Sequence, residues 1–171
     1  KEKLENCINS DLANNYGNLC QRVISFNEKN LNLEIPKNVK FNNEDLNLLN
    51  RFKENYSKIE NAINKQDINF YMNFLMETLF AANKYFNDQE PWNKKNDTNR
   101  LNTIIYVSLE LIRKISILMY PIIPETSLKA LNIFNIKEKD INFNSLLNND
   151  FLKQGMKINK INILIKKIIN G

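Results

Sequence analysis

Apolar residues recur every three or four positions through long stretches of this chain, and few helix-breaking residues interrupt them. Such spacing places the apolar side chains along one side of an α-helix. The first stripe consists of Ile8, Leu12, Tyr16, Leu19, Val23 and Phe26, and the second of Leu46, Leu49, Phe52, Tyr56, Ile59 and Ile63. Only three Gly and four Pro occur in 171 residues, which leaves little material for tight turns. The sequence therefore predicts an all-α fold.

Polar residues indicate where the helices begin. A loop containing Pro36 separates the two stripes, and Asn43 followed by two acidic residues predicts a helix start, because carboxylates are favourable at the positive end of a helix. Asp67 predicts the N-cap of a third helix that ends near Phe86. Thr98 predicts the N-cap of a fourth.

The fourth helix is apolar on most sides from Ile104 to Met119, which predicts a central position in a bundle. Pro121 and Pro124 end it, and a short fifth helix is expected to restart at Glu125. The expected architecture is a helical bundle of four long helices plus a shorter one.

We expect residues 1–171 to form a single helical domain, with the bundle at residues 5–135 and a C-terminal strap at residues 136–171. The segment "GMKINKINILIKKI" in the strap alternates locally, which fits either an extended segment or a final helix. The first residue is Lys rather than Met, which is consistent with a piece of a longer chain.

The composition excludes most kinds of catalytic site. The chain has no His, no Gly-rich phosphate loop, no Cys cluster and no Ser-centred elbow, so we expect no catalytic residue and no metal site. The net charge of +5 permits contact with polyanions but does not demand it.

Neither a membrane span nor a signal peptide is visible in the sequence. Cys7 and Cys20 fall in the same expected helix, about 20 Å apart along its axis, which is too far for a disulfide. Reduced thiols favour an intracellular protein, and we expect a cytoplasmic location without membrane contact.

Three polar residues form a ridge on the first expected helix. Asn14, Asn18 and Arg22 follow one another at intervals of four, about 120° around the helix from the apolar stripe. Amide and guanidinium groups can read the edges of nucleobases with paired hydrogen bonds. Periodicity alone favours the simpler interpretation, a solvated helix face.

Trp92, the single Trp, lies in the polar segment "NKYFNDQEPWNKKND". Pro91 before it disfavours helix, so Trp92 should lie on the turn between the third and fourth helices. It could cover the end of the bundle or serve as a stacking platform for an unpaired base. Lys84, Lys94 and Lys95 are near it in sequence and could neutralise phosphates.

Three segments in order resemble the anticodon-binding domain of bacterial-type methionyl-tRNA synthetases. "DLANNYGNLCQRVISF" is similar to the opening of that domain, with its D-L-A-N-x-x-G-N-L-x-x-R pattern. "NKYFNDQEPWNKKND" resembles its Pro-Trp segment, and "LMYPIIPETSLKAL" its following two-proline stretch. The agreement covers residues 5–135, but Lys166 and Lys167 stand where the family usually has Pro-Arg.

The resemblance implies the helical anticodon-binding domain of a class Ia aminoacyl-tRNA synthetase, which binds the CAU anticodon of tRNA(Met). Carried over by residue, Asn18 and Arg22 would read the first anticodon base, a cytosine. Trp92 would stack on that base, Pro91 would set its pose, and Asn14 would lie toward the next base. These residues favour methionyl-tRNA synthetase over a synthetase for Leu, Ile, Val or Cys. A protein–protein interaction bundle, with Trp92 in the core, remains a further alternative.

The family's catalytic half forms methionyl-adenylate from methionine and ATP, and its signature motifs are absent from these residues. The resemblance therefore implies a domain that needs no cofactor of its own, with ATP bound by a catalytic domain of the same polypeptide. Its expected partners are that catalytic domain and the anticodon loop of tRNA(Met).

Overall fold

The computed structural model describes the backbone of residues 2–160 and the side chains of residues 10–160. The described part is helical, and its one β-type contact is an isolated bridge between Glu34 and Lys157, so the all-α prediction is confirmed. The α-helices are α1 (Glu2–Leu31), α2 (Asn43–Leu49), α3 (Arg51–Glu54), α4 (Tyr56–Asn64), α5 (Ile68–Gln89), α6 (Thr98–Met119) and α7 (Pro124–Ile133). Three 3-10 helices accompany them: η1 (Pro91–Asn93), η2 (Glu138–Asp140) and η3 (Phe143–Leu147).

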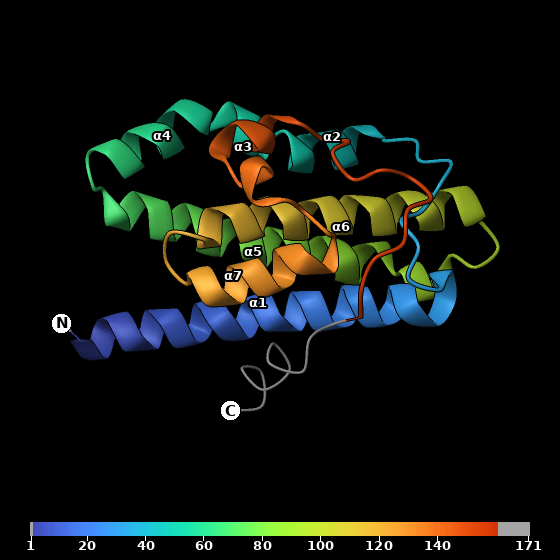
Figure 1. Ribbon diagram of the computed structural model, residues 1–171. Coiled ribbons are helices and arrows are strands. Elements are labelled where there is room, and N and C mark those ends of the chain that lie inside the picture. Colours follow the sequence, from blue (N-terminus) through green and yellow to red (C-terminus); the bar gives the residue numbers. More distant parts are fainter. Residues whose placement is uncertain (1, 161–171) are drawn as a thin grey trace.

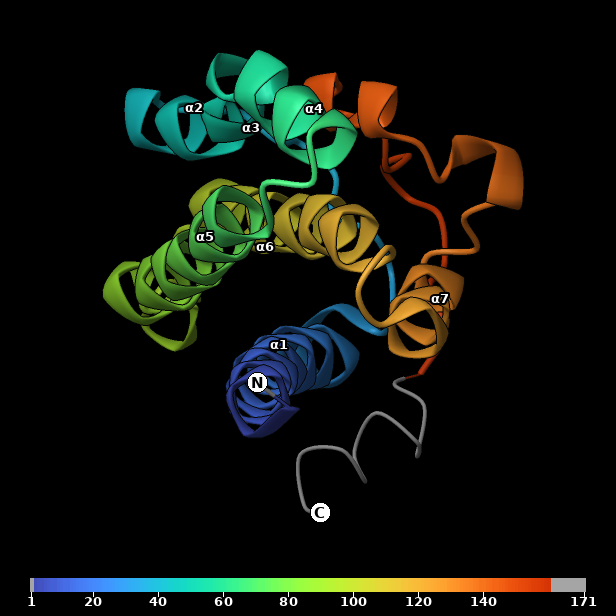
Figure 2. The ribbon, with the colours of Figure 1, turned by 90° about the vertical axis from the view of Figure 1, so that its left-hand side faces the viewer.

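Helix α6 lies at the centre of the bundle, as its apolar sequence predicted. Figure 2 shows α2–α4 on one side of it and α1 on the other, with α5 and α7 flanking, and every residue from Leu101 to Met119 is buried. Helices α1 and α5 run side by side in the same direction, whereas α6 runs the opposite way (Figure 1). The turn after α5 therefore lies at the end of the bundle where α1 finishes.

Between residues 2 and 160 there are three long helices rather than the expected four, because the second is divided. Asn50 and Asn55 separate α2, α3 and α4, with ψ values of −4° and 7° that depart from regular helix. Asn favours helix ends because its side chain competes for backbone hydrogen bonds, and the Asn55 amide donates to the carbonyl of Arg51 at 2.8 Å. The apolar stripe continues across both breaks, since Leu49 and Ile59 are fully buried.

The observed caps lie within one residue of the predicted ones. Helix α2 begins at Asn43, as predicted, and Asn42 before it is the cap, in a reciprocal pair of hydrogen bonds with Asp45. Asp67 caps α5 as predicted, accepting from the backbone N–H of Phe70 at 3.2 Å. Asp97 rather than Thr98 caps α6.

A buried charged group on α6 holds the chain that follows α7. Arg113 pairs with Glu110 and donates to the carbonyls of Ser145 and Asn148 at 3.1 and 2.6 Å. Glu110 accepts the backbone N–H of Phe151 at 2.7 Å. These bonds satisfy charges that would otherwise be costly to bury.

Lys114 follows the Glu110–Arg113 pair along α6 and is also fully buried. Its ammonium donates to the carbonyl of Leu49 at 3.2 Å and to the side chain of Asn149. Burial lowers the pKa of Lys114 to about 7.

The described part of the expected C-terminal strap is extended rather than helical after η3. The N–H of Gly155 donates to Ile35 at 2.8 Å, the N–H of Ile158 to Leu33 at 2.7 Å, and the N–H of Asn159 to Ile133 at 2.8 Å. The segment thus crosses the loop after α1 and the end of α7. Lys166 and Lys167 lie outside the described residues.

Candidate nucleic-acid interface

Trp92 lies on the turn between α5 and α6, where the sequence predicted it. Glu90, with a φ of 47°, ends α5 in the left-handed region and turns the chain into η1. Pro91 supplies the restrained φ of the first position of η1 and is buried. Trp92 next to it is 42% exposed. Part of Trp92 is therefore accessible to a ligand, while Pro91, which sets its orientation, is packed inside the protein.

Arg22 and Trp92 are brought together by a third residue, Phe86. The guanidinium carbon of Arg22 lies 5.0 Å from the centre of the Phe86 ring, and the Trp92 ring centre lies 5.9 Å from it in an edge-to-face contact. These two distances limit the separation of the guanidinium and the indole to about 11 Å. Arg22 also donates to the side-chain oxygen of Asn87. Arg22 and Trp92, both predicted from the sequence, thus pack against the same ring, that of Phe86.

Phe86 itself is almost fully buried and also packs edge-to-face against Phe26 of α1, at 6.2 Å. The sequence indicated Phe86 only as the end of an apolar stripe, and it did not indicate Asn87 at all. The sequence contained only a weak signal for the role of Phe86. Arg22 and Phe26 are four residues apart on α1, so one residue that packs against Phe26 can also contact Arg22.

Asn18 and Arg22 line a hollow of about 310 Å³ between α1 and α5. The side chains around it are Asn15, Asn18, Arg22, Met76, Phe80 and Asn83. Asn14 is exposed one helical turn before Asn18 but does not line the hollow, and Asn15 takes that place. Phe80, which the sequence analysis did not single out, is 72% exposed and lies off the buried stripe of α5.

The three lysines near Trp92 in sequence differ in their surroundings. Lys84 pairs with Asp88 one turn along α5, and the hydrogen bond to that carboxylate raises the pKa of Lys84. Lys94 is half-buried and Lys95 is exposed. Neither makes an ion pair with any residue that the structure describes, so both remain able to meet a phosphate.

A buried ionic cluster fixes the turn that carries Trp92. Arg100 of α6 donates to both oxygens of Asp45 at 2.8 and 3.1 Å and to the side chain of Gln89 at 2.7 Å. The hydroxyl of Tyr85 donates to Asp45 at 2.6 Å. Burial alone would raise the pKa of Asp45, but the hydrogen bonds from Arg100 and Tyr85 hold it below its usual value. The cluster joins the start of α2, the end of α5 and the start of α6.

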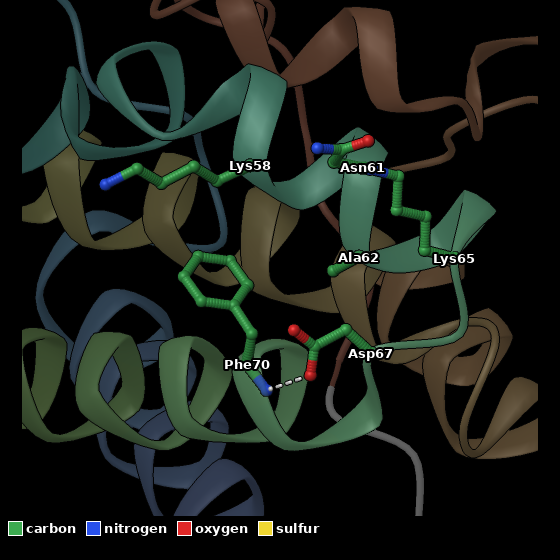
Figure 3. A pocket seen from close by; sticks show the side chains of 6 residues that line it. All are labelled: Lys58, Asn61, Ala62, Lys65, Asp67 and Phe70. Carbon is green, nitrogen blue, oxygen red and sulfur yellow. Dashed lines mark hydrogen bonds between the residues drawn. The ribbon is translucent and has the colours of Figure 1, made fainter.

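A second hollow, of about 410 Å³, lies at the corner between α4 and α5 (Figure 3). Lys58, Lys65, Phe70 and Asp67 are among its lining residues, and Asp67 is already bonded to the backbone of Phe70. It lies at the start of α5, whose 22 residues place it about 33 Å from the Trp92 turn. The two places are therefore separate.

Two observations concern metal binding and thiol reactivity among the described residues. No group of three His, Cys, Asp or Glu side chains in that part of the chain could hold a metal ion. Cys20 is fully buried, and burial raises its pKa to about 12, so its thiol is a poor nucleophile. None of the helices between residues 2 and 160 is long and apolar enough to cross a membrane.

Comparison with known proteins gives one consistent family. The model described as the anticodon binding domain of methionyl tRNA ligase matches residues 35–171. A methionine–tRNA ligase of Brucella suis is 32% identical over 136 residues, which cover 79% of this chain and 26% of that protein. A methionine–tRNA ligase of Nanoarchaeum equitans is 34% identical over 167 residues, covering 98% of this chain and 20% of that protein. The second match extends over most of α1, all of which lies before the residues that the family model matches.

The similar solved structures belong to the same family as the similar sequences. The apo form of Mycobacterium tuberculosis methionyl-tRNA synthetase superposes with a TM-score of 0.81 and 29% identity, over 93% of this chain and 33% of that one. The structure of the same synthetase in complex with methionyl-adenylate gives a TM-score of 0.80. This chain thus spans 26% and 20% of the length of the two curated relatives named above and about a third of the solved chains.

Proposed function

Because the chain belongs to the family of methionyl-tRNA ligase anticodon-binding domains, we propose that it binds the anticodon loop of tRNA(Met) and recognises the CAU anticodon. The observation that carries this proposal is the shared support of Arg22 and Trp92 on Phe86. An exposed aromatic face beside forked donors is the combination that proteins use to read unpaired bases.

The first anticodon base, a cytosine, stacks on the exposed face of Trp92. Arg22 and Asn18 then reach its pairing edge, where a carbonyl and a ring nitrogen both accept hydrogen bonds. Arg22 has five N–H donors and uses one on Asn87, so donors remain for the base. A uracil at this position presents a ring N–H in place of the nitrogen acceptor. One buried group left unpaired costs about 1–3 kcal/mol, which is enough to discriminate.

Pro91, Asn14 and two lysines assist recognition in this proposal without contacting the first base. Pro91 is buried and holds Trp92 in place. Asn14 is exposed one turn from Asn18 and extends the polar ridge toward the next base. Lys94 and Lys95 neutralise backbone phosphates near the turn, which adds affinity without selecting a sequence.

The domain acts within a longer polypeptide in this proposal. A catalytic domain of the same chain binds ATP and attaches methionine to the tRNA, in the cytoplasm. The residues described here form one helical domain that supplies recognition and no catalytic group. The share of the curated relatives that this chain covers supports this division.

The other candidate functions are less well supported. A helical anticodon domain of another class Ia synthetase does not agree with the methionyl family match. A protein-interaction bundle would place Trp92 in the core, whereas this residue is 42% exposed.

A stem-loop carrying the CAU anticodon tests the proposal directly. Trp92 is the only Trp, so its fluorescence reports on stacking without labelling. Quenching by the CAU loop, and weaker quenching by a loop with UAU, is the expected result. Fluorescence that stays unchanged with both loops would contradict the proposal.

A further inference from the structure

The turn that carries Trp92 makes local hydrogen bonds. The backbone N–H of Asn93, for example, donates to the carbonyl of Glu90 at 2.9 Å. Among the described residues, no hydrogen bond joins residues 91–97 to α1, α2 or α5. The position of the turn therefore depends on apolar packing and on the residues at its two ends.

The two ends of the turn are joined by their side chains. Gln89 is the last residue of α5, and Arg100 lies in the first turn of α6. The guanidinium of Arg100 donates to the side-chain oxygen of Gln89 at 2.7 Å, which closes residues 90–99 into a loop. The same amide of Gln89 donates through its nitrogen to Glu44 of α2 at 3.0 Å. Gln89 is thus the point where the end of α5 is bonded to both neighbouring helices.

Arg100 is itself held firmly. Its two terminal nitrogens donate to the two oxygens of Asp45, at 2.8 and 3.1 Å, in the paired geometry that a planar guanidinium allows. Asp45 is fully buried and also accepts from the hydroxyl of Tyr85 at 2.6 Å and from the backbone N–H of Asn42 at 3.1 Å. One Arg100 nitrogen serves both Asp45 and Gln89, so the anchoring of the guanidinium also aims a donor at Gln89.

The backbone next to Gln89 needs such a tie. Glu90 has a φ of 47°, in the left-handed region that is unfavourable for a residue with a Cβ. A strained residue at the start of a turn relaxes unless its neighbours hold it, and any relaxation here would move Pro91 and Trp92. A binding surface that is ordered beforehand loses less conformational entropy when its ligand arrives.

We propose that Gln89, held by Arg100, is a positioning residue for anticodon recognition. It fixes the turn so that Trp92 is in place before a base binds, and it does not contact the RNA. The inference rests on the proposed anticodon function. A purely structural cross-link would contribute to stability alone, whereas a positioning residue also restricts the motion of Trp92 and raises the affinity for the stem-loop.

Three variants of the whole chain test the inference. Gln89→Met removes both amide bonds and keeps a side chain of similar length. Gln89→Glu keeps an oxygen for Arg100 and loses the donor to Glu44, which is exposed and can turn toward water. Glu44→Ala is the matched control, because it breaks the other bond of the same amide.

Each variant is measured in three ways. Time-resolved fluorescence anisotropy of Trp92, the only Trp, reports its local motion in the absence of RNA. Titration with a CAU stem-loop gives the affinity, and denaturant unfolding gives the stability. The anisotropy is the measurement that a purely structural role would leave unchanged.

Gln89→Met should increase the fast local motion of Trp92. It should also weaken binding of the CAU loop by about 2- to 12-fold, the range for immobilising one side chain on binding. Gln89→Glu should restore both values, because the bond from Arg100 is kept, and Glu44→Ala should change neither.

Unchanged motion of Trp92 in Gln89→Met would overturn the inference, as would unchanged affinity for the CAU loop. A loss of affinity without a change in motion would also overturn it, since Gln89 would then contact the RNA directly. The proposed function fails in a different way, namely if the unaltered chain does not bind the CAU loop.

Discussion

Arg22 and Trp92 belong to different helical segments, yet both contact the ring of Phe86, one with a guanidinium over its face and the other edge-on. Phe86 is in turn held by Phe26 on α1. The positions of Arg22 and Trp92 therefore depend on Phe86, which is buried and not accessible to a ligand. This arrangement separates the residues that support the site from those that would contact RNA, and substitutions can distinguish them.

Phe86→Leu should leave the domain folded but reduce its affinity for the CAU stem-loop by about tenfold or more, since the support of both recognition residues is lost. Stability should fall by about 1–1.5 kcal/mol, as for other swaps between apolar core residues. Phe74→Leu is the matched control, because Phe74 is also a buried ring of α5 under a guanidinium, that of Arg51. Denaturant unfolding and stem-loop titration of both variants provide the check. A loss of affinity that is equal in the two variants would mean that Phe86 acts only through stability.

Arg22→Ala should weaken binding of the CAU loop far more than binding of a UAU loop, because the guanidinium reads an acceptor that uracil lacks. A difference of about 1–3 kcal/mol between the two losses is expected. Arg51→Ala serves as the control, since Arg51 also lies over a ring but at a distance from the Trp92 turn. Parallel titrations of the two loops measure the effect. Identical losses for CAU and UAU would assign Arg22 to phosphate contact alone.

Asp45→Asn should destabilise the domain by about 3–5 kcal/mol near neutral pH, because the buried side chain of Asp45 is the acceptor for Arg100 and Tyr85. The lowered pKa of Asp45 means that its contribution is fully present above the ordinary carboxylate range and is lost as the pH falls through the folded-state value. Unfolding measured from pH 7 down to pH 2 should therefore show an acid loss that is smaller in the variant. If the variant loses as much stability in acid as the unaltered chain does, other carboxylates cause most of the acid loss.

Lys114 should make the domain more stable as the pH rises from 7 to 9. Its folded-state pKa of about 7 lies well below that of an unfolded lysine, so the unfolded chain binds more protons across this range. The free energy of unfolding should rise by at most about 1.4 kcal/mol per pH unit. Lys114→Met should remove the slope, whereas Lys84→Met should not, because Asp88 raises the pKa of Lys84 above the ordinary lysine value, which already lies above this pH range. If the free energy of unfolding still rises with pH in Lys114→Met, another titrating group causes the rise.

The helices could be predicted because their signals are local. The stripe through Leu12, Tyr16 and Leu19 and the cap at Asp67 depend on residues within a few positions of one another. The division of the second helix was missed because apolar spacing continues across Asn50 and Asn55, and the periodicity is insensitive to a small change in backbone angle.

The candidate site was predictable only in part, for a related reason. Asn18, Arg22 and Trp92 carry distinctive side chains, and the family resemblance indicated them. Phe86 and Phe80 look in the sequence like ordinary members of an apolar helix. Their positions follow from the parallel course of α1 and α5 (Figure 1), which no short segment determines.

The bonds from Glu110 and Arg113 to residues 145–151 have a practical consequence for anyone who shortens this domain. The bundle of long helices looks complete at the end of α7, and a deletion there would seem harmless on a ribbon drawing. It would instead remove the peptide and side-chain partners that residues 145–151 give to a carboxylate, a guanidinium and an ammonium on α6, and it would uncover the apolar face of α6 around them. Any trimmed version intended for binding studies should therefore extend at least through Leu152.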